Sequence, residues 1–281
     1  MKKVVIWGTG QGGQMMRNVL RADMEVVAYC DNNIKLHGTV IDDIPVINLE
    51  QLLKINPDYI YISILNKEAC VQVKSQIEML KINCEIISIT KYREQFDVRL
   101  ATLKLIAKEI RGQNVKGAVA ELGVYQGELS AEINRLFPDR KIYLFDTFEG
   151  FDERDIKTEK ENQLSYGQIG QFNNTNIDLV YNRLPYQGQA IFKKGYFPDT
   201  ANGLNLRFAL VSLDADLYQP IYEGLKFFYP NMNSGGYIII HDYNSIQFKG
   251  VKMAVQQFCT ENHICVVPLC DLHGTAVIIK Y

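Results

Sequence analysis

The sequence predicts an α/β protein with two sheets of mainly parallel strands, and three observations support this fold class. Short apolar runs alternate with amphipathic segments of helical length over nearly the whole chain. Two of these runs lead directly into glycine-rich turns, VVIWGTGQGGQ near the start and AVAELGVYQGELS near the middle. The chain has 281 residues, of which 47% are hydrophobic, so it is long enough for two domains with separate cores.

Composition excludes several classes of partner. The formal net charge is -2, from 30 basic and 32 acidic side chains, and no basic stripe is present, so nucleic acid is not an expected partner. The apolar run that begins at Val4 ends at Gly8, which is too short for a secretory signal. No other run approaches the ~18 apolar residues of a membrane span. The six cysteines show no paired spacing, and we therefore expect a cytoplasmic protein without a membrane partner.

The first unit is predicted over residues 1–92. Its strands are expected at residues 3–7, 25–30, 58–65 and 84–89, and its helices at residues 14–22, 49–55 and 68–80. Asn48 is predicted to cap the second helix, because Gln51 follows three residues later. The segment that contains Asp42, Asp43 and Pro45 is predicted to be a loop. Strands that alternate with helices in this way indicate a parallel sheet.

A connector at residues 93–113 and a second unit at residues 114–281 complete the prediction. The connector is expected to hold one helix over residues 95–111, ended by Gly112. In the second unit we expect strands at residues 118–122, 141–145, 190–193, 208–213, 237–240, 265–269 and 276–280, and helices at residues 130–136, 177–184, 219–228 and 250–261.

Two connections in the second unit are informative. The stretch at residues 149–176 is polar, with few apolar residues, and is predicted to be a mobile loop that closes over a site. Only residues 270–275 separate the last two strands. That length is too short for a parallel crossover, so the last strand should pair antiparallel.

The phrase ELGVYQG, together with the antiparallel ending, resembles the class I S-adenosylmethionine-dependent methyltransferases, which have a Rossmann-like sheet. In that fold, glycines after an acid let the backbone approach the methionine part of the cofactor. The acid that closes the next strand, here Asp146, accepts hydrogen bonds from the ribose hydroxyls. The resemblance assigns cofactor binding to Glu121, Gly123, Val124, Tyr125, Gly127, Ser130, Asp146, Thr147, Gly195 and Phe197.

Four phrases narrow the resemblance further. They are YLFDTFEGF at residues 143–151, KKGYFPDT at 193–200, SLDADLYQP at 212–220 and GGYIIIHDY at 235–243. Together they resemble the macrocin O-methyltransferase family, whose members methylate sugar hydroxyls in antibiotic biosynthesis. The resemblance covers roughly residues 115–281 and implies an S-adenosylmethionine-dependent O-methyltransferase. Its acceptor would be a small-molecule sugar or nucleotide sugar, and a homo-oligomer is compatible with the sequence.

Members of that family hold a divalent metal, usually magnesium, with the aspartate of the LDAD phrase and a following Asp-Asp pair. Those positions are Asp214, His241 and Asp242 here, so the pair has become His-Asp. Magnesium prefers oxygen ligands, and His241 shifts the preference toward manganese or a softer ion. In the alternative interpretation, His241 is the general base that deprotonates the acceptor hydroxyl. A third interpretation gives His241 only a hydrogen-bonding role.

The N-terminal glycine motif supplies a second candidate site. Gly8, Gly10, Gly13 and the later Asp31 fit a nucleotide-binding half, and the phrases AYCDNN and IDDIPVI resemble small nucleotide-sugar-binding domains of sugar-modifying enzymes. A domain that only packs or dimerises is the alternative. Two other functions stay open for the chain: an NAD-dependent sugar-nucleotide oxidoreductase or epimerase, and a non-catalytic sugar-nucleotide-binding protein.

Overall fold

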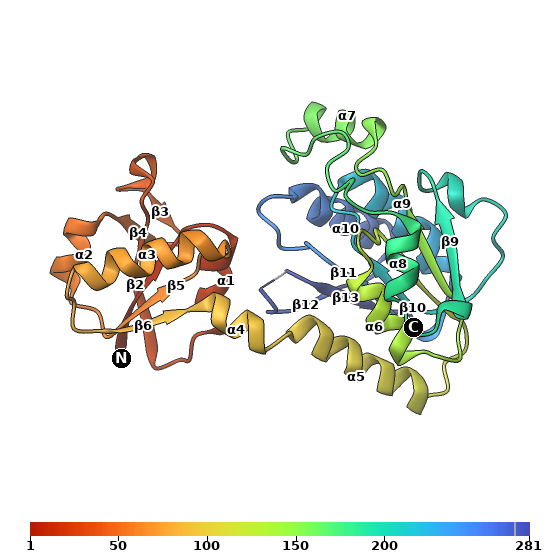
Figure 1. Ribbon diagram of the computed structural model, residues 1–281, viewed down its shortest axis with the longest axis horizontal. Helices are drawn as coiled ribbons and strands as arrows, with labels where there is room; N and C mark the ends of the chain where they lie inside the picture. Colours follow the sequence, from red (N-terminus) through yellow and green to blue (C-terminus); the bar gives the residue numbers. More distant parts are fainter. Residues whose placement is uncertain (273) are drawn as a thin grey trace. The chain divides into compact units, whose positions relative to one another are not determined.

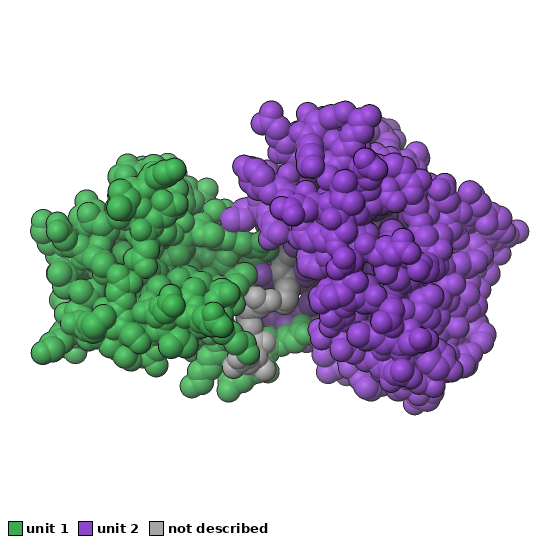
Figure 2. Space-filling model, turned by 45° about the horizontal axis from the view of Figure 1, so that its top comes forward, with its two compact units in different colours: residues 1–97 green, residues 98–281 purple. Residues whose placement is uncertain are grey.

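The chain folds into two compact units, residues 1–97 and residues 98–281, in a computed structural model (Figures 1 and 2). The structure describes residues 1–272 and 274–281, with the side chains at 93 and 94 left out, so His273 lies outside the described residues. Within these residues, no helix is both long enough and apolar enough to cross a membrane.

Unit 1 is a six-stranded sheet with helices between its strands, in the order β3-β4-β2-β1-β5-β6. Its elements are β1 (Lys2–Trp7), α1 (Gln11–Val19), β2 (Met24–Cys30), the 3-10 turn η1 (Ile34–Leu36), β3 (Val40–Ile41), β4 (Ile44–Ile47), α2 (Leu49–Ile55), β5 (Tyr59–Ile62), α3 (Lys67–Met79), β6 (Glu85–Ser88) and α4 (Ile89–Gln95). The strands β4, β2, β1, β5 and β6 are parallel neighbours. This confirms the parallel sheet that the alternation predicts.

Local chemistry explains two features of unit 1. The capping box before α2 is confirmed: Asn48 accepts from the Gln51 backbone N–H at 2.9 Å, and the Gln51 side chain accepts from the Asn48 N–H at 3.1 Å. The prediction of a loop after β2 is wrong in part, because β3 and β4 form a hairpin in this segment. Asp42 and Asp43 both have positive φ, 47° and 66°, as a two-residue type I′ turn requires.

Unit 2 contains a seven-stranded sheet in the order β12-β13-β11-β10-β7-β8-β9. Its elements are α5 (Val98–Gly112), β7 (Ala118–Leu122), α6 (Glu128–Leu136), β8 (Ile142–Asp146), α7 (Glu153–Glu161), α8 (Ile177–Arg183), η2 (Gln187–Gln189), β9 (Ala190–Lys194), η3 (Asp199–Ala201), β10 (Phe208–Leu213), α9 (Tyr218–Asn231), β11 (Met232–Ile240), α10 (Lys249–Asn262), β12 (Val267–Pro268) and β13 (Ala276–Ile279). The last strand, β13, pairs antiparallel with β11, as the short preceding gap predicts.

The sheet of unit 2 is buried on both faces. Successive side chains of a strand point to opposite faces, and β11 shows this alternation. Ile238 and Ile240 belong to one core cluster, with apolar residues of α9 and α10, whereas Ile239 belongs to a second cluster with residues of α5 and α6. Helices α9 and α10 pack side by side (Figure 1). Burial on both faces leaves the strand ends as the place where polar groups gather.

The connector differs from the single helix predicted over residues 95–111. Helix α4 ends at Gln95, Phe96 has an extended backbone with φ -128° and ψ 112°, and α5 starts at Val98. The face of α5 that carries Leu103, Ile106 and Ile110 is buried in the core of unit 2. Tertiary burial of this stripe therefore makes α5 part of the second unit rather than a free linker.

The loop predicted at residues 149–176 is corrected in part, because this stretch contains α7, whereas its mobility and its closure over a site stay predictions. Asp152 caps this helix by accepting from the Arg154 N–H at 2.9 Å. Two buried carboxylates of α7 have partners outside the helix: Asp155 accepts from the Tyr196 hydroxyl at 2.9 Å, and Glu159 accepts from the Tyr218 N–H at 2.8 Å. The low apolar content misled the prediction, because α7 is attached by these hydrogen bonds and by a single buried apolar side chain, Ile156.

Candidate active site

The glycine loop between β7 and α6 reaches the end of a neighbouring strand. Gly123 follows β7 with φ +83°, a left-handed conformation that favours glycine. A Cβ on this residue would lie 2.1 Å from the carbonyl oxygen of Asp214, which follows β10. Only glycine allows this approach, and it brings the candidate cofactor loop beside the candidate catalytic aspartate.

Asp146, at the end of β8, holds this loop in place. Its Oδ2 accepts hydrogen bonds from the backbone N–H groups of Val124 at 2.7 Å and Tyr125 at 2.9 Å. Its Oδ1 accepts from the N–H of Phe148 at 2.6 Å. The residue predicted to bind ribose therefore has a structural role that the sequence did not indicate. Because each carboxylate oxygen can accept two hydrogen bonds, ribose binding stays a prediction compatible with these contacts.

Glu121 and Ser130 form a buried pair beneath the loop. The Ser130 hydroxyl donates a hydrogen bond to Glu121 Oε2, and only 2% of Glu121 is exposed. Burial raises the pKa of the Glu121 carboxyl to about 8, although the Ser130 hydrogen bond opposes this shift. The glutamate therefore connects β7 to the first turn of α6, the turn that closes the glycine loop.

Three other predicted cofactor residues lie near this loop or in the adjoining core. The Thr147 hydroxyl donates to the Gly150 carbonyl at 2.7 Å, and the Gly195 N–H donates to the Asp146 carbonyl at 2.9 Å. Phe197 has a packing role, because its ring is buried against Phe145 and other core aromatics. Cofactor contacts by these residues, and by Gly127 at the N-terminus of α6, stay predictions.

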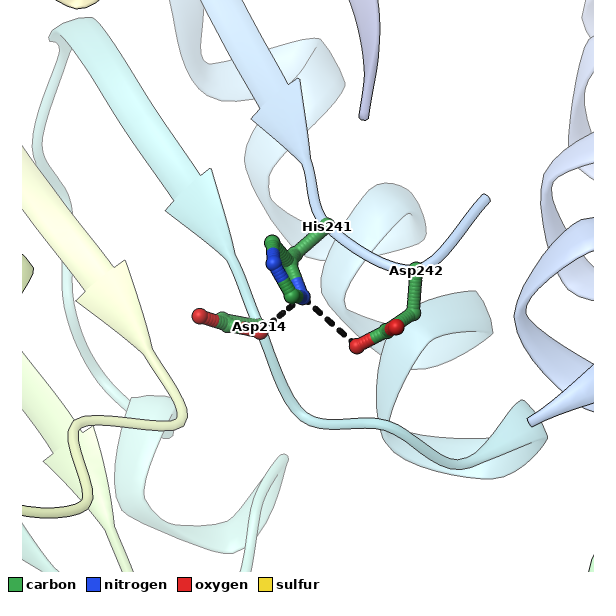
Figure 3. A group of neighbouring side chains, drawn as sticks. All are labelled: Asp214, His241 and Asp242. Atoms are coloured by element: carbon green, nitrogen blue, oxygen red, sulfur yellow. Dashed lines mark hydrogen bonds and ion pairs between the residues drawn. The ribbon is translucent and has the colours of Figure 1, made fainter. Parts of the chain in front are cut away.

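Asp214, His241 and Asp242 converge at the ends of β10 and β11 (Figure 3). The His241 ring lies between the two carboxylates, with Nδ1 3.0 Å from Asp214 Oδ1 and 2.6 Å from Asp242 Oδ2. The side chains are 22%, 15% and 12% exposed in that order, so solvent reaches them only in part. The three residues predicted from the sequence are thus brought together.

The charges of this cluster depend on one another. Burial alone would lower the pKa of His241, but the Asp214 carboxylate and the hydrogen bonds to both aspartates raise it to about 10. Burial would likewise raise the pKa of Asp214, and the positive charges of His241 and Arg99 hold it below its usual range instead. In the metal-free state, Nδ1 therefore carries a proton that it donates to the carboxylates.

Arg99 is a member of the site that the sequence analysis missed. From the first turn of α5, its Nη2 donates to Asp214 Oδ2 at 2.9 Å, across 115 residues of sequence. Only 13% of the side chain is exposed, and its Nε has no hydrogen-bond partner in the described structure. One signal could have found it, because a cation in the first turn of a helix opposes the macrodipole unless an anion compensates.

Asp216 also joins the cluster, two residues after Asp214. Burial, followed by the charges of Asp242 and Asp214, raises its pKa well above the usual value. Asp216 and Asp242 both have positive φ, 58° and 55°. Such a backbone is uncommon for residues other than glycine and is concentrated at functional sites.

The donor set of the cluster can accommodate a metal ion. One ligand atom each from Asp214, His241 and Asp242 lie within 4.8 Å of one another. Two carboxylate oxygens and one imidazole nitrogen suit manganese or zinc at least as well as magnesium. The Arg99 guanidinium is hydrogen-bonded to Asp214 Oδ2, so its positive charge would lie beside any cation held by the three ligand residues.

The N-terminal glycine motif lies at the carboxyl ends of the parallel strands of unit 1. Gly8, Gly10 and Asp31 line a pocket there. Gly13 lies behind it in α1, where a Cβ would come 2.0 Å from the Gly8 carbonyl oxygen. The structure therefore brings the four predicted residues of the first unit into one region.

Unit 2 has the fold of the class I methyltransferases. The calicheamicin methyltransferase CalS11 is similar, with a TM-score of 0.57, 17% identity and coverage of 77% of this chain and 94% of its own. The O-methyltransferase NovP gives a TM-score of 0.52 and 22% identity, over 65% of this chain and 79% of its own.

Residues 92–280 match the family described as Macrocin-O-methyltransferase (TylF). The chain belongs to this family. Residues 1–88 match a separate family, described as C2185-like, N-terminal.

Two curated relatives come from Streptomyces. The demethyldecarbamoylnovobiocin O-methyltransferase of Streptomyces niveus is 26% identical over 163 residues, 52% of this chain. The 8-demethyl-8-(2,3-dimethoxy-alpha-L-rhamnosyl)-tetracenomycin-C 4'-O-methyltransferase of Streptomyces olivaceus is 29% identical over 160 residues, also 52% of this chain. In both cases the match spans 60% of the relative's length.

Proposed function

We propose that the protein is an S-adenosylmethionine-dependent O-methyltransferase that acts on a hydroxyl group of a sugar. Family membership and the names of the two Streptomyces relatives support this proposal. One observation carries it: the Gly123 loop lies against the backbone of Asp214, the residue whose side chain contacts His241. Groups able to activate an acceptor therefore lie directly beside a loop suited to the methyl donor.

The reaction requires alignment and deprotonation of the acceptor. The methyl group passes from the sulfonium to the oxygen in one in-line displacement, so both must be held at the correct distance. A sugar hydroxyl is a poor nucleophile near neutral pH and must lose its proton as the bond forms. Of the cofactor contacts, we assign the methionine part to the loop that begins at Gly123 and the ribose to Asp146.

We propose that Asp214, His241 and Asp242 hold a divalent metal. When bound, such an ion supplies positive charge that polarises the acceptor hydroxyl and lowers its pKa. His241 Nδ1 must release its proton to become a ligand, and the carboxylates at 2.6 and 3.0 Å are placed to accept hydrogen bonds or coordinate alongside it. Arg99 fixes the second oxygen of Asp214, which leaves Oδ1 facing the imidazole.

The protonation state of His241 favours this assignment over a general-base role. A general base needs a free lone pair that faces the acceptor. Nδ1 instead faces two carboxylates, and its N–H donates to them in the metal-free state. The carboxylates raise the pKa of His241 to about 10, so the ring is already protonated near neutral pH and cannot take the acceptor proton. This supports activation of the acceptor by a metal ion.

Substitution of the two aspartates tests the proposal. Asp214→Asn and Asp242→Asn should each reduce methyl transfer to nucleotide-sugar acceptors by at least about 10²-fold, because both remove a charged metal ligand. Binding of S-adenosylhomocysteine, measured by calorimetry, should change little, and a chelator should reproduce the loss in the wild-type protein. Asp199→Asn, on an exposed aspartate, is the matched control. Full wild-type activity in excess chelator would contradict the metal assignment.

A further inference from the structure

Unit 1 contains a pocket whose lining residues are all separate from the candidate methyl-transfer residues of unit 2. Its volume is about 330 Å³, and it is lined by residues 7–12 after β1, residues 31–32 after β2 and residues 63–65 after β5. All three segments follow the carboxyl ends of parallel strands. The pocket is therefore built by the strand ends of one sheet, within one unit.

The topology of the sheet makes this edge the expected ligand site. In the order β4-β2-β1-β5-β6, the chain leaves β1 toward β2 on one side and later returns to pair β5 on the other side. The strand order thus reverses between β1 and β5. In open α/β sheets, ligands bind outside the carboxyl ends of the strands at such a switch point.

Two glycines explain how α1 comes so close to this edge. A Cβ on Gly12 would lie 2.1 Å from the Ser63 carbonyl oxygen, and one on Gly13 would lie 2.0 Å from the Gly8 carbonyl oxygen. Packing therefore requires glycine at both positions. This close packing places the first turn of α1 at the pocket, where the positive end of the helix dipole favours an anionic group.

Gly10 has a different explanation. Its φ is -68°, which any residue can adopt, and a Cβ added to it would meet no heavy atom within 4 Å. Neither backbone strain nor protein packing requires glycine there, although the residue lines the pocket. The absent side chain keeps open the space in front of the first turn, where a ligand phosphate can approach the backbone.

Asp31 is held in a fixed orientation at the mouth of the pocket. Its Oδ2 accepts from the Thr9 N–H at 3.0 Å and the Thr9 hydroxyl at 2.7 Å, and its Oδ1 accepts from the Asn33 N–H at 2.9 Å. Oδ1 keeps capacity for one more donor. An acid at the end of the second strand is the group that accepts from ribose hydroxyls in nucleotide-binding sheets.

We propose that this pocket binds one nucleoside diphosphate, with the ribose on Asp31 and the diphosphate at the first turn of α1. The volume is near the lower end of the ~300–1,000 Å³ typical of ligand pockets, which suits one nucleotide better than a dinucleotide. The lining segments contain no lysine or arginine, so affinity must come from the nucleoside as well as the phosphates. Every residue that lines the site belongs to unit 1.

Calorimetry on the full chain tests this proposal. UDP, TDP, ADP, NAD⁺ and inorganic phosphate are titrated separately, with S-adenosylhomocysteine at saturation so that the cofactor site of unit 2 is filled. At least one nucleoside diphosphate should bind one to one, and inorganic phosphate should not. NAD⁺ should bind no more tightly than ADP, because the volume of the pocket suits a single nucleotide.

A pair of variants makes the result specific to the pocket. Gly10→Val should weaken nucleoside diphosphate binding at least about tenfold while the melting temperature stays close to wild type, since no protein atom is displaced. Gly188→Val, at an equally open glycine in unit 2, should bind as wild type does. Absence of binding by every nucleoside diphosphate, unchanged affinity in Gly10→Val, or NAD⁺ binding more than tenfold tighter than ADP would overturn the proposal. Methyl transfer and S-adenosylhomocysteine binding are read separately, so a failure of the proposed function is distinguishable.

Discussion

Glu121 and Asp214 are carboxyl groups of one site whose pKa values shift in opposite directions. Glu121 is buried and has a hydroxyl as its direct partner, so burial dominates and its pKa rises to about 8. Asp214 contacts the cations His241 and Arg99, which outweigh burial and lower its pKa. Carboxyl groups with pKa values displaced in opposite directions are typical of active sites.

Glu121→Gln is expected to change how stability depends on pH. The raised pKa of Glu121, about 8 against 4.5, means that the folded state holds the proton more tightly than the unfolded state. The stabilisation that the protonated Glu121 gives to the folded state is fully present below about pH 4.5 and is lost as the pH rises toward 8. Relative to the variant, the wild-type free energy of unfolding should fall by about 2–4 kcal/mol over that range, measured by urea unfolding. Parallel pH profiles for the two proteins would show that Glu121 is ionised in the folded state.

His241→Asp distinguishes the two mechanisms for acceptor activation. With a metal, the variant should stay active and bind magnesium more tightly, because a carboxylate adds a hard oxygen and a negative charge. With His241 as general base, the same change should reduce the rate by about 10² to 10⁴-fold. Initial rates and magnesium titrations measure both effects, and His263→Asp, at an exposed histidine, is the control. We expect the first result.

At the scale of elements, α5 connects the two units in sequence and also completes the site. Its apolar stripe is buried in unit 2, and its first turn carries Arg99 to Asp214. The glycine loop after β7 is likewise fixed by a different element, through the carboxylate of Asp146, the last residue of β8. Each candidate functional group is therefore positioned by contacts between elements distant in sequence.

The Arg99–Asp214 pair can be measured with a double-mutant cycle. Arg99→Met should lower the free energy of unfolding by about 1.5–3 kcal/mol, the size expected for a hydrogen bond between charged groups that are mostly buried. In the Asp214→Asn background the same change should cost much less, because Arg99 has already lost its partner. Arg99→Lys should restore part of the stability. Equal losses in both backgrounds would mean that the pair contributes no coupling.

At the scale of the whole molecule, the two units have separate sheets and separate cores, divided at residues 97 and 98. A methyltransferase sheet that completes its own core should not need the first unit to bind its cofactor. The boundary also shows that α5 belongs with the second sheet, because four of its residues are in that core: Leu103, Ile106, Ala107 and Ile110.

Two fragments test this independence. Residues 95–281 should fold and bind S-adenosylhomocysteine about as tightly as the full chain, because α5 and Arg99 are retained. Residues 114–281 should fold poorly, because they lack the buried stripe of α5. Thermal unfolding and calorimetry measure the two properties. A folded 95–281 fragment that fails to bind, beside a full chain that binds tightly, would mean that unit 1 contributes to the cofactor site.

The sequence by itself determined the alternation of strands and helices, the capping box at Asn48 and the antiparallel last strand, because periodicity, capping and loop length are local properties of the chain. The same local reading failed at residues 149–176, where α7 is attached by hydrogen bonds to distant residues. Arg99 and the loop-holding role of Asp146 were likewise decided only by the tertiary structure. Their partners are apart in sequence, and only packing brings them together. Removal from water then makes an unpaired charge or N–H group costly and strengthens each hydrogen bond that forms.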